Sequence, residues 1–141
     1  MQPSLIRRAC RDDWPRIHEI RSAVRENQLS DPNLVTAEDM AWFTDNPGIW
    51  VWEEEGHIGG FSASDTRDGT VWALFVDPAQ EGRGIGRSLL RATLDTLREA
   101  GHLTATLSTG PGTRAEQFYR KAGWTVIGHS AKGELVFQSP L

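Results

Sequence analysis

Residues 76–90 combine amino-acid types and spacings that suit the binding of an anion. An apolar run at residues 71–76 predicts a strand, Asp77-Pro78 predicts a turn, and an apolar stripe predicts a helix from about residue 84. Between the strand and the helix, three glycines alternate over five residues: Gly82, Gly84 and Gly86. Glycines let backbone N–H groups crowd together without Cβ clashes and point at a ligand on the helix N-terminus. The segment therefore predicts a phosphate or pyrophosphate site, and hence a phosphorylated cofactor.

Two common glycine motifs do not fit this segment. A P-loop needs G-x-x-x-x-G-K-[ST], but Arg87 stands where the lysine would be and Glu81 occupies the first glycine position. A dinucleotide fingerprint needs G-x-G-x-x-G, but arginine or leucine occupies the last glycine position in the two available frames. What remains is a G-x-G between a strand and a helix.

With V-D-P before it and R-S-L-L after it, this segment resembles the cofactor motif Q/R-x-x-G-x-G/A of the GNAT superfamily of acetyl-CoA-dependent N-acetyltransferases. Residues 81–86 read E-G-R-G-I-G, so a glutamate stands at the first position. Main-chain amides do most of the binding in such a cradle, so the cradle should survive this change. A carboxylate facing a pyrophosphate would be unfavourable, and we expect the Glu81 side chain to turn away.

A second segment, residues 114–124, resembles the family motif N-x-x-A-x-x-F-Y-x-K-x-G-F. The alanine, the Phe-Tyr pair, the lysine and the glycine keep the family spacing, and Trp124 replaces the final phenylalanine. Gly112 occupies the asparagine position, so one amide contact to the cofactor should be missing. The resemblance extends over nearly the whole chain.

The resemblance implies acetyl-CoA as the co-substrate and assigns roles to particular residues. Main-chain groups of Leu74, Phe75 and Val76 would pair with the pantetheine arm, and an N–H near Val76 would face the oxyanion. The pyrophosphate would lie on Gly82, Arg83, Gly84, Ile85, Gly86, Arg87 and Ser88. Tyr119, the only tyrosine of the chain, would be the catalytic proton donor to the departing thiolate; without the motif, a core aromatic would be the preferred interpretation.

Acetyl transfer also needs a neutral amine, since an alkylamine has a pKa of about 10.4. The predicted strands at residues 71–76 and 103–108 contain no carboxylate that could act as the base. Asp65 and Glu26 are candidates, although a solvated loop charge is the preferred interpretation of each, and a water relay from backbone carbonyls is an alternative. No histidine and carboxylate spacing matches a metal site, so no metal is expected.

The acceptor site is expected near the polar run at residues 25–30. Arg25, Glu26 and Asn27 are candidate contacts for a small polar substrate, or they only solvate a helix end. The chain has six tryptophans, far above ordinary usage. Core packing accounts for most of them, and Trp72, on the strand beside the thioester, is the candidate for contact with the amine.

Length and composition bound the class of protein. The 141 residues, with a net charge of −4, predict a single domain over residues 1–141 and argue against nucleic acid as a partner. No run is long and apolar enough to span a membrane, and no signal-peptide pattern is present. The lone cysteine, Cys10, cannot form an internal disulfide, which fits the cytoplasm, and it is expected in the core. The acceptor would be a small-molecule or protein amine, and relatives of this kind are often homodimers.

The hydrophobic pattern predicts an α/β (α+β) fold with the order β-α-α-β-β-β-α-β-α-β-β, which is also the order of the family. This order implies a mixed, mostly antiparallel central sheet with helices on both faces. The sequence thus favours an N-acetyltransferase that acts by direct attack in a ternary complex. The alternative is a non-catalytic acyl-CoA-binding or regulatory domain with the same fold, which the departures at Glu81 and Gly112 would favour.

Overall fold

The chain forms one seven-stranded sheet in a computed structural model that describes residues 4–24 and 36–141. The strands are β1 (Leu5–Arg8), β2 (Ile49–Glu54), β3 (His57–Asp65), β4 (Thr70–Val76), β5 (Thr104–Thr109), β6 (Thr125–His129) and β7 (Leu135–Pro140). Their order in the sheet is β1-β2-β3-β4-β5-β7-β6, and every neighbouring pair is antiparallel except β4 and β5. The helices are α1 (Trp14–Ala23), α2 (Ala37–Asp45), α3 (Ile85–Glu99) and α4 (Arg114–Lys121). The predicted class and element order are confirmed.

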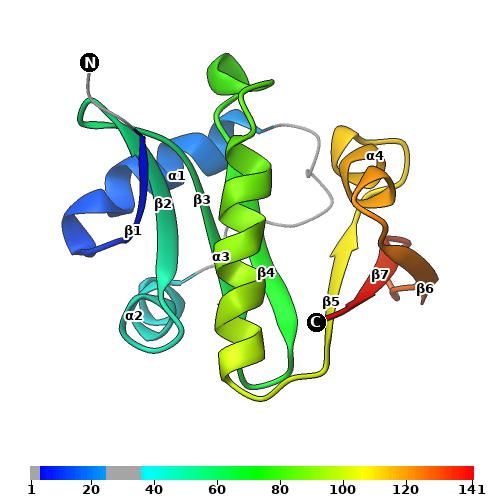
Figure 1. Cartoon of the computed structure of the whole chain (residues 1–141). Helices are drawn as coiled ribbons and strands as arrows, with labels where there is room; N and C mark the ends of the chain where they lie inside the picture. Colours follow the sequence, from blue (N-terminus) through cyan, green and yellow to red (C-terminus); the bar gives the residue numbers. More distant parts are fainter. Residues whose placement is uncertain (1–3, 25–35) are drawn as a thin grey trace.

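Helices cover both faces of the sheet (Figure 1). On one face, α1 and α2 bury Ile17, Ile20, Met40 and Phe43 against β2, β3 and β4. On the other face, α3 packs through Ile85 and Leu89 on β2 and β4, and through Leu90 and Leu97 on the half of the sheet that carries α4. The two crossovers, from β4 to β5 and from β5 to β6, run in the same direction along the sheet, so the right-handed rule places α3 and α4 on one face.

Helix α3 sits unusually close to β3. A Cβ on Gly60 would lie 2.9 Å from the Leu89 side chain and 2.9 Å from the Phe75 carbonyl oxygen, so only glycine fits there. One turn further along α3, the buried Thr93 hydroxyl donates to the Ser62 hydroxyl at 2.6 Å, and Ser62 donates to the Leu89 carbonyl at 3.1 Å. These contacts hold the first half of α3 against the sheet.

Strands β4 and β5 diverge immediately after they meet. Thr70 and Thr106 are their only paired residues, supported by a hydrogen bond from the Thr106 amide to the Gly69 carbonyl at 3.1 Å. Figure 1 shows β5 leading away from β4 toward α4. The edge of β4 that faces β5 therefore has no partner strand along residues 71–76 in the described ranges, which opens the sheet at its centre.

Local sequence signals account for most element boundaries. The Thr36 hydroxyl accepts from the Asp39 amide and the Asp39 carboxylate accepts from the Thr36 amide, so α2 begins with a capping box. Thr113 likewise caps α4 through the Glu116 amide. The Glu116 carboxylate does not complete a capping box, because it accepts from the Gly112 amide rather than from the Thr113 amide.

The expected core position of Cys10 is wrong. Cys10 is exposed, because it precedes a short 3-10 helix at the surface (Arg11–Asp13) rather than lying in β1. Along α3 the sheet-facing stripe is buried, whereas Ala100, beyond the end of the helix, is exposed; the buried members are Ile85, Leu89, Thr93 and Leu97. Among the described residues, no helix is long and apolar enough to cross a membrane.

Candidate functional site

A cavity of about 520 Å³ lies where β4 and β5 diverge. Its walls come from β4, the glycine loop, the start of α3, one side of α4 and the residue that follows α1. The lining residues are Val24, Leu74, Phe75, Val76, Gln80, Glu81, Gly82, Gly84, Ile85, Gly86, Arg87, Arg114, Ala115, Gln117, Phe118, Tyr119 and Lys121. The cavity thus joins the two sequence segments that resemble family motifs, although they lie about thirty residues apart in the chain.

The cavity reaches both faces of the sheet. Leu74 packs with the α3 and α4 clusters, whereas its neighbour Phe75 packs with the α1 and α2 cluster. Val24, just after α1, lines the cavity on that second face. A ligand that enters beside α3 can therefore present its end to the α1 side through the gap between β4 and β5.

The glycine loop presents an open backbone to the cavity. Gly82 and Gly84 have φ of +82° and +77°, a conformation that favours glycine, and a Cβ at either position would meet nothing within 4 Å. Gly84 is the N-cap of α3, and no side chain caps the free amides of its first turn. Those amides are the donors that a phosphate group would use.

Arg83 lies within the same loop, but an ion pair holds its side chain away from the cavity. Its guanidinium contacts both carboxylate oxygens of Glu54 at 2.9 Å and the Gln80 side-chain oxygen at 2.7 Å, and lies 5.1 Å from the Trp52 ring centroid. Neither Arg83 nor Ser88 lines the cavity. Their proposed contact with the cofactor stays a prediction, whereas the remaining loop residues named from the sequence lie at the cavity wall.

Glu81 does not turn away from the cavity as expected. It lines the wall and forms an ion pair with Arg114 at the start of α4. The pair joins the glycine loop to α4 and balances the carboxylate with a guanidinium. The glutamate at the first motif position therefore has its charge offset within the site.

Tyr119 lies deep in the cavity wall, only 5% exposed, with its ring against Trp124 and Phe137. Burial raises the pKa of its hydroxyl above the ordinary value of 10.0, so the group stays protonated at neutral pH. Within residues 4–24 and 36–141, the hydroxyl makes no hydrogen bond. It is a protonated donor without an acceptor among the described residues.

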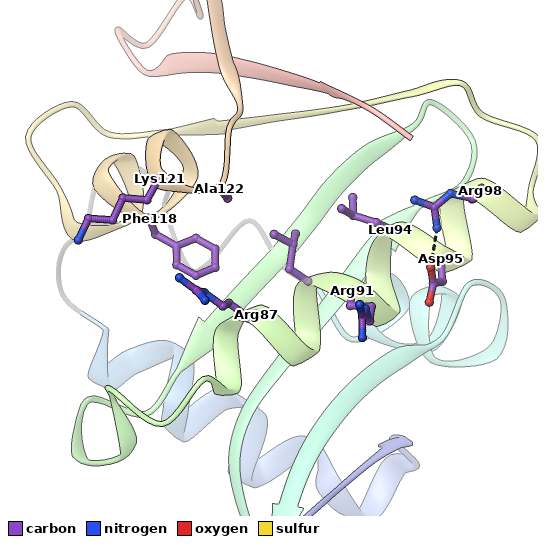
Figure 2. A pocket seen from close by; sticks show the side chains of 9 residues that line it. Arg87, Arg91, Leu94, Asp95, Arg98, Phe118, Lys121 and Ala122 are labelled. Carbon is purple, nitrogen blue, oxygen red and sulfur yellow. Dashed lines mark hydrogen bonds and ion pairs between the residues drawn. The ribbon is translucent and has the colours of Figure 1, made fainter.

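A basic groove of about 730 Å³ continues from the cavity between α3 and α4 (Figure 2). Figure 2 shows arginines on α3 along one side and Phe118, Lys121 and Ala122 of α4 on the other. Arg98 pairs with Asp95 at 2.6 Å, whereas Arg87, Arg91 and Lys121 have no ion pair in the described part of the chain. Arg87, Phe118 and Lys121 line the groove and the cavity alike, so the two are continuous.

The sequence reasoning missed Arg91 and Lys121 as site residues. Arg91 follows Arg87 by four positions and therefore lies on the same side of a helix. Lys121 is the lysine of the second motif, two residues after Tyr119. Both positions can be recognised in the sequence. However, a cationic residue on a helix surface can be assigned to a binding groove only when the helix that faces it is known.

The acceptor contacts expected from the sequence are only partly described. Arg25, Glu26 and Asn27 lie outside the described residues. Trp72 does not line the cavity; its ring stacks on Phe43 of α2 at 3.8 Å between centroids. Trp72 is the extra residue of a bulge in β4, since Ala63 and Ser64 of β3 pair with Ala73 and Val71.

Asp65, a candidate base, does not line the cavity. Both of its carboxylate oxygens bind Arg67, at 2.9 and 2.8 Å, and this guanidinium holds the pKa of Asp65 below its usual range. Glu26, the other candidate, lies outside the described residues. In the ranges that the structure covers, no group of three histidine, cysteine, aspartate or glutamate side chains is placed to hold a metal ion.

The fold and the two sequence motifs at the cavity point to one family of proteins, and a comparison with family profiles gives the same family. The profile of the acetyltransferase (GNAT) family matches residues 14–124. The chain therefore belongs to the GNAT family of acetyltransferases.

Curated relatives of known name match part of the chain in sequence. The mycothiol acetyltransferase of Propionibacterium freudenreichii subsp. shermanii is 37% identical over 111 residues, which cover 69% of this chain and 35% of that protein. The chain thus spans about a third of the length of this and other curated relatives.

Two solved structures share the fold. The PaiA N-acetyltransferase of Thermoplasma acidophilum, in complex with coenzyme A, superposes with a TM-score of 0.82 at 14% identity and covers 99% of both chains. YncA of Salmonella typhimurium, with its cofactor acetyl-CoA, gives 0.79 at 23% identity, over 98% of this chain and 94% of that one.

Proposed function

We propose that the chain transfers the acetyl group of acetyl-CoA to a primary amine in a ternary complex. The observation that carries this proposal is the single cavity that brings together the unpaired edge of β4, the uncapped start of α3 and the buried hydroxyl of Tyr119. Each of these three features suits one part of acetyl-CoA. The edge of β4 suits the amide chain of the pantetheine arm, the start of α3 suits the pyrophosphate, and the Tyr119 hydroxyl suits the leaving thiolate.

The unpaired edge of β4 supports the placement of the pantetheine arm. Past Thr70, the N–H and C=O groups of β4 that face β5 have no strand partner in the described ranges. The two amides of pantetheine can pair with such an edge as an added strand would. This pairing holds the thioester beside Phe75 and Val76, where the cavity passes through the sheet.

The glycine loop and the basic groove supply the phosphate contacts. The amides at the start of α3 suit the pyrophosphate, and the helix dipole adds about 0.3–1 kcal/mol for a charge there. Beyond the loop, the groove holds three cations that have no ion pair within residues 4–24 and 36–141: Arg87, Arg91 and Lys121. We assign this groove to the adenosine end, with its 3′-phosphate. Glu81 is paired with Arg114, so the positive charge of the guanidinium offsets the repulsion between the Glu81 carboxylate and the pyrophosphate.

In the chemical step, the amine nitrogen forms a bond to the acetyl carbon while the carbon–sulfur bond breaks. The amine loses one proton and the sulfur gains one. An alkyl thiol has a pKa of about 8.5, below the raised pKa of Tyr119, so complete proton transfer from the phenol is unfavourable. Tyr119 acts by donating a hydrogen bond to the sulfur as negative charge develops on it, with solvent supplying the final proton.

The acceptor is proposed as a primary amine of a small molecule or a protein. The relatives named mycothiol acetyltransferase motivate the inclusion of deacetylated mycothiol among the amines to be tested. Arg25, Glu26, Asn27 and Trp72 remain proposed contacts of the acceptor.

The first experiment is a calorimetric titration of the protein with acetyl-CoA, beside desulfo-CoA and NAD. Micromolar binding of the two CoA species but not of NAD is expected. Free-thiol release from acetyl-CoA is then measured over a panel of amines. Binding without thiol release for any amine would favour the non-catalytic acyl-CoA-binding domain, and no binding would contradict the cofactor assignment.

A further inference from the structure

Arg21, on α1, is a partly buried cation without an anion. Its guanidinium carbon lies 5.3 Å from the ring centroid of Phe75 and 6.0 Å from that of Trp72. No hydrogen bond or ion pair reaches it from any described residue. Burial alone lowers the pKa of Arg21, with no carboxylate to oppose that shift, yet an arginine keeps its charge.

Other partly buried arginines near α1 are fully paired. Arg7 and Arg16 have side chains that are each 33% exposed. Arg7 binds Asp13 and Glu53, and Arg16 binds Asp77 and Glu19. Arg21 departs from this pattern. A cation over an aromatic ring gains attraction within about 6 Å, so contacts at 5.3 and 6.0 Å lie toward the edge of that range and do not replace an ion pair.

Arg21 does not line the cavity itself, but residues next to it do. Val24 follows it by one helical turn on the same side of α1, and Val24 and Phe75 both line the cavity on the α1 face. The proposed thioester lies beside Phe75, so an acceptor amine would approach it from this face. An anionic group on the acceptor would then lie within reach of the Arg21 guanidinium.

We propose that Arg21 binds the carboxylate of the acceptor, so that the substrate class is an amino carboxylate: an amino acid or a similarly small amine with a carboxylate near it. The planar fork of a guanidinium donates two parallel hydrogen bonds to a carboxylate, and one positive charge matches one negative charge. This inference rests on the proposed acetyl transfer and specifies its acceptor.

The test compares matched acceptors that differ only in the anionic group. Phenylalanine, phenylalaninamide and phenethylamine form one series, and alanine, alaninamide and ethylamine form another; phosphoethanolamine tests a phosphate in place of the carboxylate. Each rate is divided by the fraction of neutral amine. We expect kcat/KM to be at least about tenfold higher for the amino acids, which is the size of effect for one charge-assisted hydrogen-bonded pair.

Variants then locate the preference. Arg21→Gln should raise KM for amino carboxylates about 10- to 100-fold, with little change in kcat or acetyl-CoA affinity, and Arg21→Lys should fall between. The melting temperature should stay within a few degrees, because Arg21 has no ion pair to lose. Arg11→Gln is the matched control: Arg11 also lies over a tryptophan, Trp14, at 5.1 Å, but it belongs to the 3-10 helix before α1 and lines a separate hollow beside Cys10.

Direct binding separates this inference from the proposed function. Calorimetry measures the binding of each amino acid and its amide to the protein alone and to its desulfo-CoA complex. Carboxylate binding that Arg21→Gln removes supports the inference even if no acetyl transfer occurs. Equal binding or equal kcat/KM for acid and amide, a preference for phosphoethanolamine, or a carboxylate preference that survives Arg21→Gln would overturn it.

Discussion

Arg83 and Glu54 form a two-point ion pair that ties the glycine loop to the end of β2, with both contacts at 2.9 Å. Arg83 lies between Gly82 and Gly84 of the loop, where a cation would be expected to contact a phosphate. The pair instead holds its guanidinium over Trp52, outside the cavity lining. Arg87, four residues later, lines both the cavity and the basic groove. The two arginines therefore have different surroundings: Arg83 ties the loop to β2, whereas Arg87 lies at the wall of the cavity.

Substitution of these arginines should separate the two roles. Arg83→Gln removes a partly exposed ion pair worth about 0.2–1 kcal/mol and should weaken acetyl-CoA binding less than about fivefold. Arg87→Gln removes a phosphate contact and should weaken it about 10- to 100-fold. Calorimetric titration of both variants is the measurement. Equal losses would mean that Arg83 leaves Glu54 and contacts the cofactor.

Gly86 offers a test of the phosphate cradle without backbone strain. Its φ lies outside the positive region, and a Cβ there would lie 3.4 Å from the Phe118 ring. Gly86→Leu should therefore fold, because leucine favours a helix, but its side chain would occupy the cavity and abolish measurable acetyl-CoA binding. Gly128→Leu on β6, where a Cβ meets nothing within 4 Å, is the control. Unchanged affinity in Gly86→Leu would refute the cradle.

How far the sequence predicts this molecule depends on how local each signal is. The capping box of Thr36 and the glycine turns act within a few residues, so they were readable along with the order of the elements. The direction of the Arg83 side chain depends on Glu54, 29 positions away, which no local pattern reveals. The unpaired state of Arg21 is likewise visible only once α1 is packed on β4. Sequence therefore predicted the backbone of the site better than its charges.

The basic groove predicts a preference for the 3′-phosphate of CoA. Arg91 lies in the groove without an ion pair in the described part of the chain, whereas Arg98, two turns further along α3, is paired with Asp95. Arg91→Gln should lower the affinity for CoA about tenfold and leave that for 3′-dephospho-CoA unchanged. Arg98→Gln should change neither. Competition binding with the two nucleotides measures the ratio, and an equal loss for both would place the phosphate elsewhere.

Tyr119→Phe isolates the hydroxyl from the ring. The ring packs against Trp124 and Phe137, so the phenylalanine variant should fold and bind acetyl-CoA normally. Loss of the hydrogen bond to the developing thiolate should lower kcat about 10²-fold with little change in KM. Steady-state thiol release with a saturating amine gives both constants. An undiminished kcat would show that the Tyr119 hydroxyl does not stabilise the developing thiolate.

The raised pKa of Tyr119 also predicts the alkaline behaviour of the protein. Because burial raises the pKa above 10.0, the hydroxyl stays protonated as pH rises to 10, and kcat should increase with deprotonation of the amine and show no fall up to that pH.

Folding is linked to the same proton. Above pH 10 the unfolded chain has lost the Tyr119 proton, whereas the folded chain retains it. The free energy of unfolding should therefore decrease as pH rises through this range. Tyr119→Phe lacks this proton, and its melting temperature should fall less steeply between pH 9 and pH 11, roughly the range around the ordinary tyrosine pKa. Parallel slopes for the two proteins would show that the phenol has an ordinary pKa in the fold.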